Sequence, residues 1–322
     1  MQTLSFLNLK QSKGNFFKDT DGNVVLDLNC PLPLGYNHDV LINARDTNVY
    51  DRFLQGTVDV SSVPPQDFAD ILCEDLMPVA PSGLDQVHLC DGNSTTANEV
   101  ALSTAIMDFA IRHNKTNYAN LSVLGFQGSA HGSSVATLSC SDATANAGNV
   151  PTYDWPVSDH PSIRYPYAKY ENANIAEEER CFEAAKNTIE ERRAAGKDVA
   201  AIIVEPISSI DMHAATPNFY KKLRNLAKTE GIPFIVDETK SGMGQTGKMW
   251  GHENWYLQDR DGGSPDFVTF GGKAGISGYY STYEMRQNSH CASFEQNLDM
   301  SKVLSFGITW RHMQRKNMLE LV

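Results

Sequence analysis

The sequence predicts an α/β protein built on a mostly parallel sheet with helices on both faces. Short apolar runs alternate along the chain with longer segments of helical spacing, which indicates repeated strand–helix units. The runs are apolar at nearly every position, as is typical of strands buried on both faces. Several runs end in a charged residue, and ligands bind at the carboxyl ends of parallel strands.

The composition is that of a soluble globular protein, with 322 residues, 41% hydrophobic and 20% charged. A formal net charge of -12 and a pI near 5.2 argue against nucleic acid or an anionic membrane as a partner. No apolar run has the length of a membrane span, and no secretory or mitochondrial leader is visible. Six scattered cysteines without a CxxC pair favour free thiols in a reducing compartment, and we expect no metal site.

The elements follow in order from local signals. Residues 14–29 contain two β-rich runs around Asp21-Gly22, a strong turn dipeptide, and predict a hairpin. Residues 143–170 are rich in Asn, Pro and Tyr and are expected to follow the surface. The expected strands are Val87–Cys90, Leu121–Phe126, Val199–Val204, Ile232–Glu238 and Phe267–Phe270. The expected helices are Phe68–Met77, Ala97–Ile111, Glu177–Ala195, and one from Thr216-Pro217 to Gly231, with Thr as cap and Pro at the first position.

Two of these strands deliver an acid and an amine to the same edge of the sheet. Asp237 ends the run Phe-Ile-Val, and Lys273 follows Thr-Phe-Gly-Gly, whose glycines allow close backbone approach. An acid can hold a protonated pyridine nitrogen, and a partly desolvated amine can form a Schiff base with an aldehyde. A turn-capping carboxylate and a solvated lysine are the ordinary alternatives. Together the two groups favour pyridoxal phosphate, which has both a ring nitrogen and an aldehyde.

Other polar residues lie near this edge. The turn before the helix at Ala97 contains Ser94 and Thr95, whose hydroxyls and free N–H groups suit a phosphate, although ordinary helix capping has the same appearance. Glu205 ends a third strand before Pro206, where a structural turn is the alternative. His131 fits a polar core position as well as a site position.

Residues 242–248 match both GxGxxG and GxxxxGK, the patterns of dinucleotide and P-loop sites. Met249 stands where a P-loop has the Ser or Thr that binds Mg²⁺, and no convincing helix follows. Residues 239–241 separate the first glycine from the strand. A nucleotide site is therefore the minor alternative.

Taken together, these segments resemble the class III aminotransferases, pyridoxal-phosphate enzymes of fold type I, and most of all their eukaryotic 4-aminobutyrate branch. The block from Asp237 to Lys273 indicates the class, and Tyr153–Pro156 with Arg164–Pro166 indicates the branch. The other matching segments are Ser12–Phe17, Asp21–Asn23, Leu34–His38, Ala97–Glu99, Ile203–Pro206, Thr246–Trp250, Val268–Phe270 and Thr309-Trp310.

The resemblance implies a domain organisation and a role for each site residue. It implies an N-terminal segment, 1–55, and a cofactor-binding large domain, 56–322, with the C-terminal small domain missing beyond residue 322. Lys273 would be the Schiff-base lysine, Asp237 the partner of the pyridine nitrogen, and Glu205 a glutamate beside substrate and cofactor. The other cofactor-binding residues would be Ser94, Thr95, His131 and Thr309. Thr309 would reach the phosphate of a neighbouring subunit, which implies a homodimer with shared sites.

The chain also departs from the family pattern. The aromatic ring that stacks on the cofactor and the arginine that grips a substrate carboxylate are replaced by Ala130 and Ser133. Lys240 stands where a glutamine near the cofactor is expected. The cysteine pair that holds an iron–sulfur cluster in some members is absent around residues 90–98.

The implied reaction is transamination of an ω-amino acid, foremost 4-aminobutyrate with 2-oxoglutarate to give succinate semialdehyde and L-glutamate. The resemblance places the protein in the mitochondrial matrix, with the cytoplasm as the alternative, and implies no nucleic-acid or membrane partner. One alternative function is a truncated or inactive relative that keeps the fold, motivated by the missing domain and by Ser133. The other is a P-loop-like nucleotide-binding protein, motivated by residues 242–248.

Overall fold

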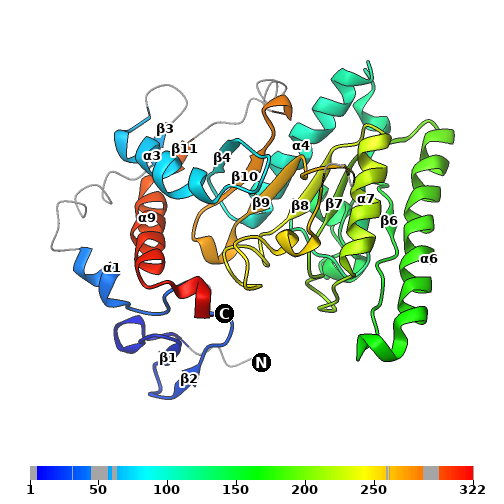
Figure 1. The fold of residues 1–322 in the computed structure, drawn as a ribbon. Coiled ribbons are helices and arrows are strands. Elements are labelled where there is room, and N and C mark those ends of the chain that lie inside the picture. Colours follow the sequence, from blue (N-terminus) through cyan, green and yellow to red (C-terminus); the bar gives the residue numbers. More distant parts are fainter. Residues whose placement is uncertain are drawn as a thin grey trace.

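The computed structural model describes residues 6–30, 32–44, 57–59, 64–258, 260, 262–285 and 297–321. Its centre is a seven-stranded sheet in the order β4-β10-β9-β8-β7-β5-β6 (Figure 1). The strands are β4 (Gln86–Cys90), β5 (Leu121–Phe126), β6 (Val157–Ser158), β7 (Asp198–Val204), β8 (Phe234–Asp237), β9 (Phe267–Phe270) and β10 (Ser277–Ser281). The pairs β6–β5, β5–β7, β7–β8 and β8–β9 are parallel. Strand β10 is antiparallel to both β9 and β4. The predicted mostly parallel sheet is confirmed.

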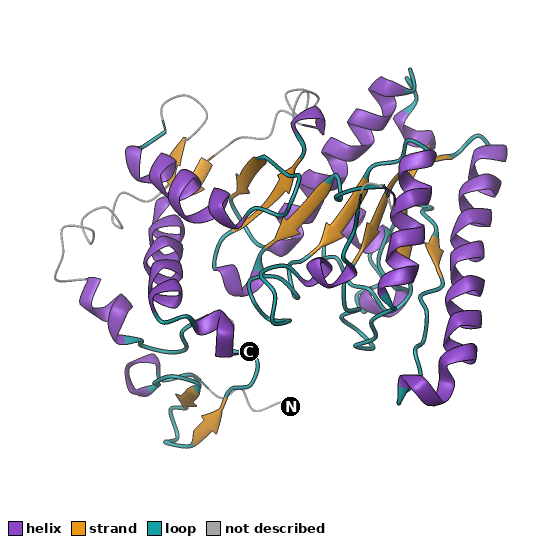
Figure 2. Ribbon diagram, in the orientation of Figure 1, coloured by secondary structure: helices purple, strands orange, loops and turns teal. Residues whose placement is uncertain are grey.

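Helices cover both faces of the sheet, as predicted (Figure 2). Alternate residues of a strand point to opposite faces. Ile203 of β7 belongs to one core cluster with Ala101, and Ile202 belongs to the other with Leu223. The long helices are α4 (Ser94–Arg112), α6 (Tyr167–Ala194) and α7 (Pro217–Thr229), and Ala101 lies on α4 and Leu223 on α7. Burying each large aliphatic side chain stabilises the fold by about 1.5–3 kcal/mol.

The structure differs from the expected elements in several places. Strand β10 is not among them, because serine and glycine flank its buried Tyr279 and Tyr280 and hide the apolar pattern. Within residues 143–170, β6 pairs with β5 as an edge strand. Helix α6 begins at Tyr167 rather than Glu177, because Pro166 occupies its N-cap and the first turns, a mixture of aromatic, small and polar residues, give no clear apolar period. The hydroxyl of Thr216 precedes α7 as expected but donates to Glu178 instead of capping the helix.

The N-terminal hairpin forms as predicted, with β1 (Phe16–Lys18) antiparallel to β2 (Val24–Leu26). Helix α1 (Asp39–Asn43) packs against α9 (Met300–Arg315), which carries Thr309. The proposed boundary between residues 55 and 56 lies outside the described residues and stays a prediction.

The remaining elements are short. The predicted helix Phe68–Met77 is α3 (Gln66–Asp70) followed by the π-helical η3 (Ile71–Leu76) and the 3₁₀ turn η4 (Met77–Val79). Strands β3 (Thr57–Asp59) and β11 (Asn297–Asp299) pair with each other. The others are α5 (Val135–Ser139) and the 3₁₀ turns η1 (Leu9–Gln11), η5 (Tyr118–Asn120), η6 (Ala143–Ala145), η7 (Gly251–Trp255), η9 (Gly272–Ala274) and η10 (Met318–Leu321). Among the described helices, none combines the length and the apolar character needed to cross a bilayer.

Candidate active site

Lys273 lies in η9, just beyond the carboxyl end of β9. A Cβ atom at Gly271 would lie 2.6 Å from Ser94 Oγ, and a Cβ at Gly272 would lie 2.6 Å from the carbonyl oxygen of Thr239. Gly272 also has a φ of +56°, which glycine adopts most readily. The two glycines therefore let the Lys273 turn rest against both the start of α4 and the loop after β8.

Lys273 is exposed and lines two cavities. A cavity of about 490 Å³ also contains residues of the loop after β8 and of the loop after β7. Its lining residues are Asn29, Ile207, Ser209, Met212, Thr239, Lys240, Ser241, Gln245, Thr246, Gly272 and Lys273. A second cavity, of about 360 Å³, is mostly apolar and includes Phe306, Thr309 and Trp310 of α9. Thr309 thus lies near Lys273 of its own chain.

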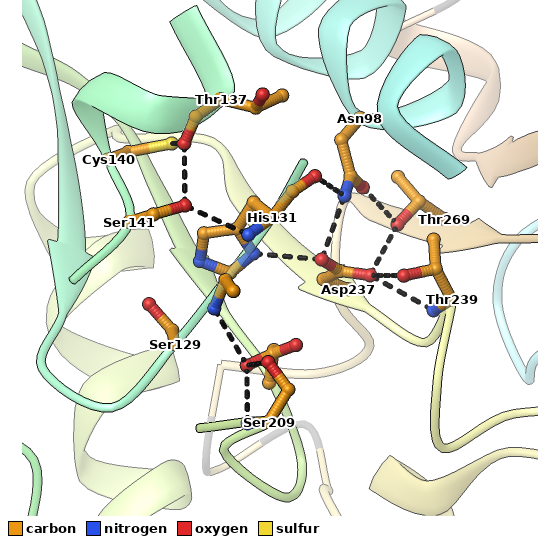
Figure 3. A network of polar contacts seen from close by, with 12 residues as sticks. Asn98, Ser129, His131, Thr137, Cys140, Ser141, Ser209, Asp237, Thr239 and Thr269 are labelled. Atoms are coloured by element: carbon orange, nitrogen blue, oxygen red, sulfur yellow. Dashed lines mark hydrogen bonds and ion pairs between the residues drawn. The ribbon is translucent and has the colours of Figure 1, made fainter. Parts of the chain in front are cut away.

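Asp237 ends β8, and its side chain has no exposed surface. Its Oδ2 accepts hydrogen bonds from Asn98 Nδ2 and His131 Nδ1, each at 2.8 Å. Its Oδ1 accepts from the Thr239 amide at 2.9 Å and the Thr239 hydroxyl at 2.6 Å (Figure 3). Burial raises the pKa of this carboxyl, but the bonds from His131 and Thr239 outweigh it and lower the pKa overall. Asp237 is therefore an ionised acceptor whose roughly four lone-pair positions all face protein donors.

Asn98 connects this carboxylate to three parts of the chain. It projects from α4, accepts from the Thr269 hydroxyl of β9 at 2.6 Å and donates to the carbonyl oxygen of His131 at 2.7 Å. The His131 amide donates to Ser141 Oγ at 2.9 Å (Figure 3). Among the described residues, His131 Nε2 is buried without a hydrogen-bond partner. The network fixes the positions of Asp237 and His131 relative to α4 and β9.

Glu205 follows β7 and is also buried. Its Oε2 accepts from the Ser209 amide at 2.9 Å, the Ser209 hydroxyl at 3.0 Å and the Ala130 amide at 3.3 Å. Its Oε1 lies 3.3 Å from Lys240 Nζ. Burial raises the pKa of Glu205, and nearby Asp237 adds to the rise, which exceeds the opposing effects of His131 and Lys240. Potential ligand atoms of His131, Glu205 and Asp237 lie within 4.8 Å of one another.

Ser94 and Thr95 form the first turn of α4, behind the N-cap residue Asn93. Asn93 Oδ1 accepts from the Thr95 amide at 2.9 Å, and Thr95 Oγ1 accepts from the Ser133 amide at 3.2 Å. Ordinary capping is therefore present. The same turn points the positive end of the α4 dipole toward Gly271 and the start of the Lys273 turn.

Sequence reasoning missed the role of Asn98. Asn98 had a signal, because it is a polar residue at a sheet-facing position of an apolar helix. Lys240 was singled out only as a departure from the glutamine that the family has near the cofactor, and the structure places it in the same cavity as Lys273. Residues 242–248, by contrast, form turns followed by the 3₁₀ turn η7, so they lack the helix that a phosphate loop needs.

A family model for aminotransferase class-III matches residues 2–310. The chain belongs to the class III aminotransferases. Pyridoxal phosphate is the cofactor of this family. The 4-aminobutyrate aminotransferase of Dictyostelium discoideum is 30% identical, with 98% of this chain and 67% of that protein aligned. The mitochondrial 4-aminobutyrate aminotransferase of Homo sapiens is 32% identical over 98% of this chain and 66% of its own length.

Solved structures share the fold. The lysine aminotransferase from M. tuberculosis superposes with a TM-score of 0.84 at 24% identity and covers 99% of this chain and 75% of its own. A phospholyase from Arthrobacter gives 0.81 at 19% identity, with coverage of 99% and 72%. The family assignment and the fold expected from the sequence are confirmed. The chain spans about two thirds of the length of the curated relatives it matches.

Proposed function

We propose that this chain catalyses pyridoxal-phosphate-dependent transamination of an ω-amino acid. The first substrates to test are 4-aminobutyrate and 2-oxoglutarate, because the curated relatives at 30% and 32% identity are named 4-aminobutyrate aminotransferases. The observation that carries the proposal is the Lys273 turn, which is exposed in a cavity and seated against Ser94 and Thr239. An amine, a helix N-terminus and an ionised carboxylate thus lie along one edge of the sheet.

The residues along this sheet edge have the chemical groups that the cofactor requires. Lys273 offers an accessible amine, and the first turn of α4 offers N–H and hydroxyl groups for a phosphate. Asp237 has the right charge for a protonated ring nitrogen, because its pKa is lowered. Its surface is filled by Asn98, His131 and Thr239, so contact with a ring N–H requires one of these donors to turn away.

In the proposed reaction the cofactor, when bound, supplies an electron sink for the carbanion formed at the substrate carbon. Lys273 Nζ would hold the cofactor's aldehyde carbon and, once released, move a proton to and from the reacting carbon. Asp237 would hold the proton on the ring nitrogen, and His131 and Thr239 keep Asp237 ionised. Ser94 and Thr95 would anchor the phosphate, and Glu205 would lie beside the substrate.

Assembly and compartment are part of the proposal. We propose a homodimer in which Thr309 contributes to the partner's cofactor site, and a mitochondrial location, supported by the mammalian relatives that are named mitochondrial. Sedimentation velocity tests the dimer. A protein that binds the cofactor without transaminating would instead support the inactive-relative alternative.

The decisive test combines cofactor binding with turnover. Purified protein mixed with pyridoxal phosphate should show a visible absorption band, and borohydride reduction with peptide mass spectrometry should place the cofactor on Lys273. Lys273→Ala should abolish both signals and glutamate formation from 4-aminobutyrate and 2-oxoglutarate. Lys248→Ala, which removes another exposed lysine, is the matched control. Labelling of a different lysine, or turnover by Lys273→Ala, would refute the proposal.

A further inference from the structure

The larger cavity beside Lys273 contains a second lysine. Lys240 enters from the loop after β8, and its side chain is 49% exposed. Its ammonium donates to the carbonyl oxygen of Ala130 at 2.7 Å and to Ser209 Oγ at 2.6 Å, and it lies 3.3 Å from Glu205 Oε1. These contacts fix the ammonium at the cavity wall while leaving about half of the side chain accessible.

The charge of this cavity is opposite to that of the whole chain. The described residues that line it include two lysines and no carboxylate, whereas the chain has a formal net charge of -12. Glu205 contacts Lys240, but its side chain is only 2% exposed and does not line the cavity. A cavity with this lining favours an anionic ligand over a neutral or cationic one.

We propose that Lys240 binds the carboxylate of the amino acid or oxo acid that reacts at Lys273, an inference that rests on the proposed transamination. An ammonium has three N–H donors, and the contact with Glu205 is the longest of its three. The N–H that faces Glu205 is therefore the donor that an incoming carboxylate can accept from at the least cost in free energy. The bonds that Glu205 accepts from Ser209 and Ala130 all end on Oε2 and are unaffected, so only Oε1 gives up a contact. Lys240 therefore selects carboxylate-bearing substrates.

Direct binding tests the inference without turnover. Glutarate, an unreactive dicarboxylate, is titrated calorimetrically into the purified full chain without cofactor. Lys240→Gln should weaken binding about tenfold, the loss expected for one charge-assisted hydrogen bond. Lys240→Arg should keep the affinity within about threefold, because it keeps the charge. Lys248→Gln removes an exposed lysine that does not line the cavity and should change nothing. Equal urea midpoints confirm that the variants are folded.

Kinetics with matched substrates adds a second measurement. Lys240→Gln should raise KM for 4-aminobutyrate about tenfold with kcat within about twofold, the pattern of lost uniform binding. It should leave KM for n-butylamine, which lacks the carboxylate, unchanged. Equal glutarate affinity in wild type and Lys240→Gln, or no glutarate binding by the wild type, overturns the inference. A tenfold difference in glutarate affinity without any turnover would support carboxylate binding by Lys240 and count against the proposed transamination.

Discussion

Asp237 and Glu205 occupy equivalent positions on neighbouring strands, but their pKa values are shifted in opposite directions. Val236 pairs with Val204, so the two carboxyl groups follow side by side at the end of β8 and β7. Both are buried, yet the pKa of Asp237 is lowered and the pKa of Glu205 is raised. Burial acts on both in the same direction. The difference must come from their partners.

The hydrogen bonds explain the difference. Asp237 accepts four bonds of 2.6–2.9 Å from Asn98, His131 and Thr239. Glu205 accepts two bonds near 3 Å from Ser209, and its contacts with Ala130 and Lys240 are both 3.3 Å. Short bonds to the charged form stabilise it, whereas longer ones do not offset burial. The pKa values of two acids at one sheet edge are thus shifted in opposite directions by the different donors around them.

The largest effect is expected when each acid is replaced by its amide. In Asp237→Asn an NH₂ group replaces one carboxylate oxygen, so two buried donors lose their acceptor, and the free energy of unfolding should fall by about 2–5 kcal/mol. Glu205→Gln should cost about 1 kcal/mol or less, because this site already disfavours the charge and Lys240 can turn to solvent. Urea unfolding followed by tryptophan fluorescence measures both. Equal losses, or a larger loss for Glu205→Gln, would contradict the hydrogen-bond explanation.

The sequence predicts the positions of these acids but not their difference. Each ends a fully apolar run, and such runs specify buried parallel strands whose carboxyl ends meet at one edge. The partners that separate the two pKa values are distant in sequence: Asn98 lies on α4, and His131 follows β5. Their approach depends on how α4 packs on the sheet, which no local pattern encodes. Strand β10 was missed for a related reason, because its place between β4 and β9 depends on tertiary pairing.

His160 shows what burial does to a ring that makes no hydrogen bond to a carboxylate among the described residues. It contacts the aromatic rings of Phe126, Phe219 and Tyr220, and burial lowers its pKa from 6.5 to about 4. Between these values the unfolded chain binds the proton and the folded protein does not, so stability rises with pH. The contribution is up to about 3 kcal/mol.

The corresponding variant is His160→Gln. It should flatten the dependence of unfolding free energy on pH between 4 and 6.5, measured by urea unfolding at several pH values. His113→Gln, which removes an exposed histidine at the end of α4, is the control. An unchanged slope in His160→Gln would mean that burial of this ring does not control its protonation.

The smallest expected effect is a difference in sign between the pH profiles of the two acids. The lowered pKa of Asp237 gives stability that is present above its ordinary pKa of 3.8 and is lost as pH falls through the folded value. The raised pKa of Glu205 gives stability that is present below its ordinary pKa of 4.5 and is lost as pH rises through the folded value.

Subtracting the wild-type profile from each variant's profile isolates these contributions. The difference curve for Asp237→Asn should fall as pH rises toward 3.8 and then stay level. The curve for Glu205→Gln should rise above pH 4.5, where the wild type loses the contribution of its protonated acid. Curves of the same sign would show that one environment controls both carboxyl groups. Curves of opposite sign would show that donors from α4 and its neighbouring loops, rather than depth in the fold, decide the direction in which each acid's pKa is shifted.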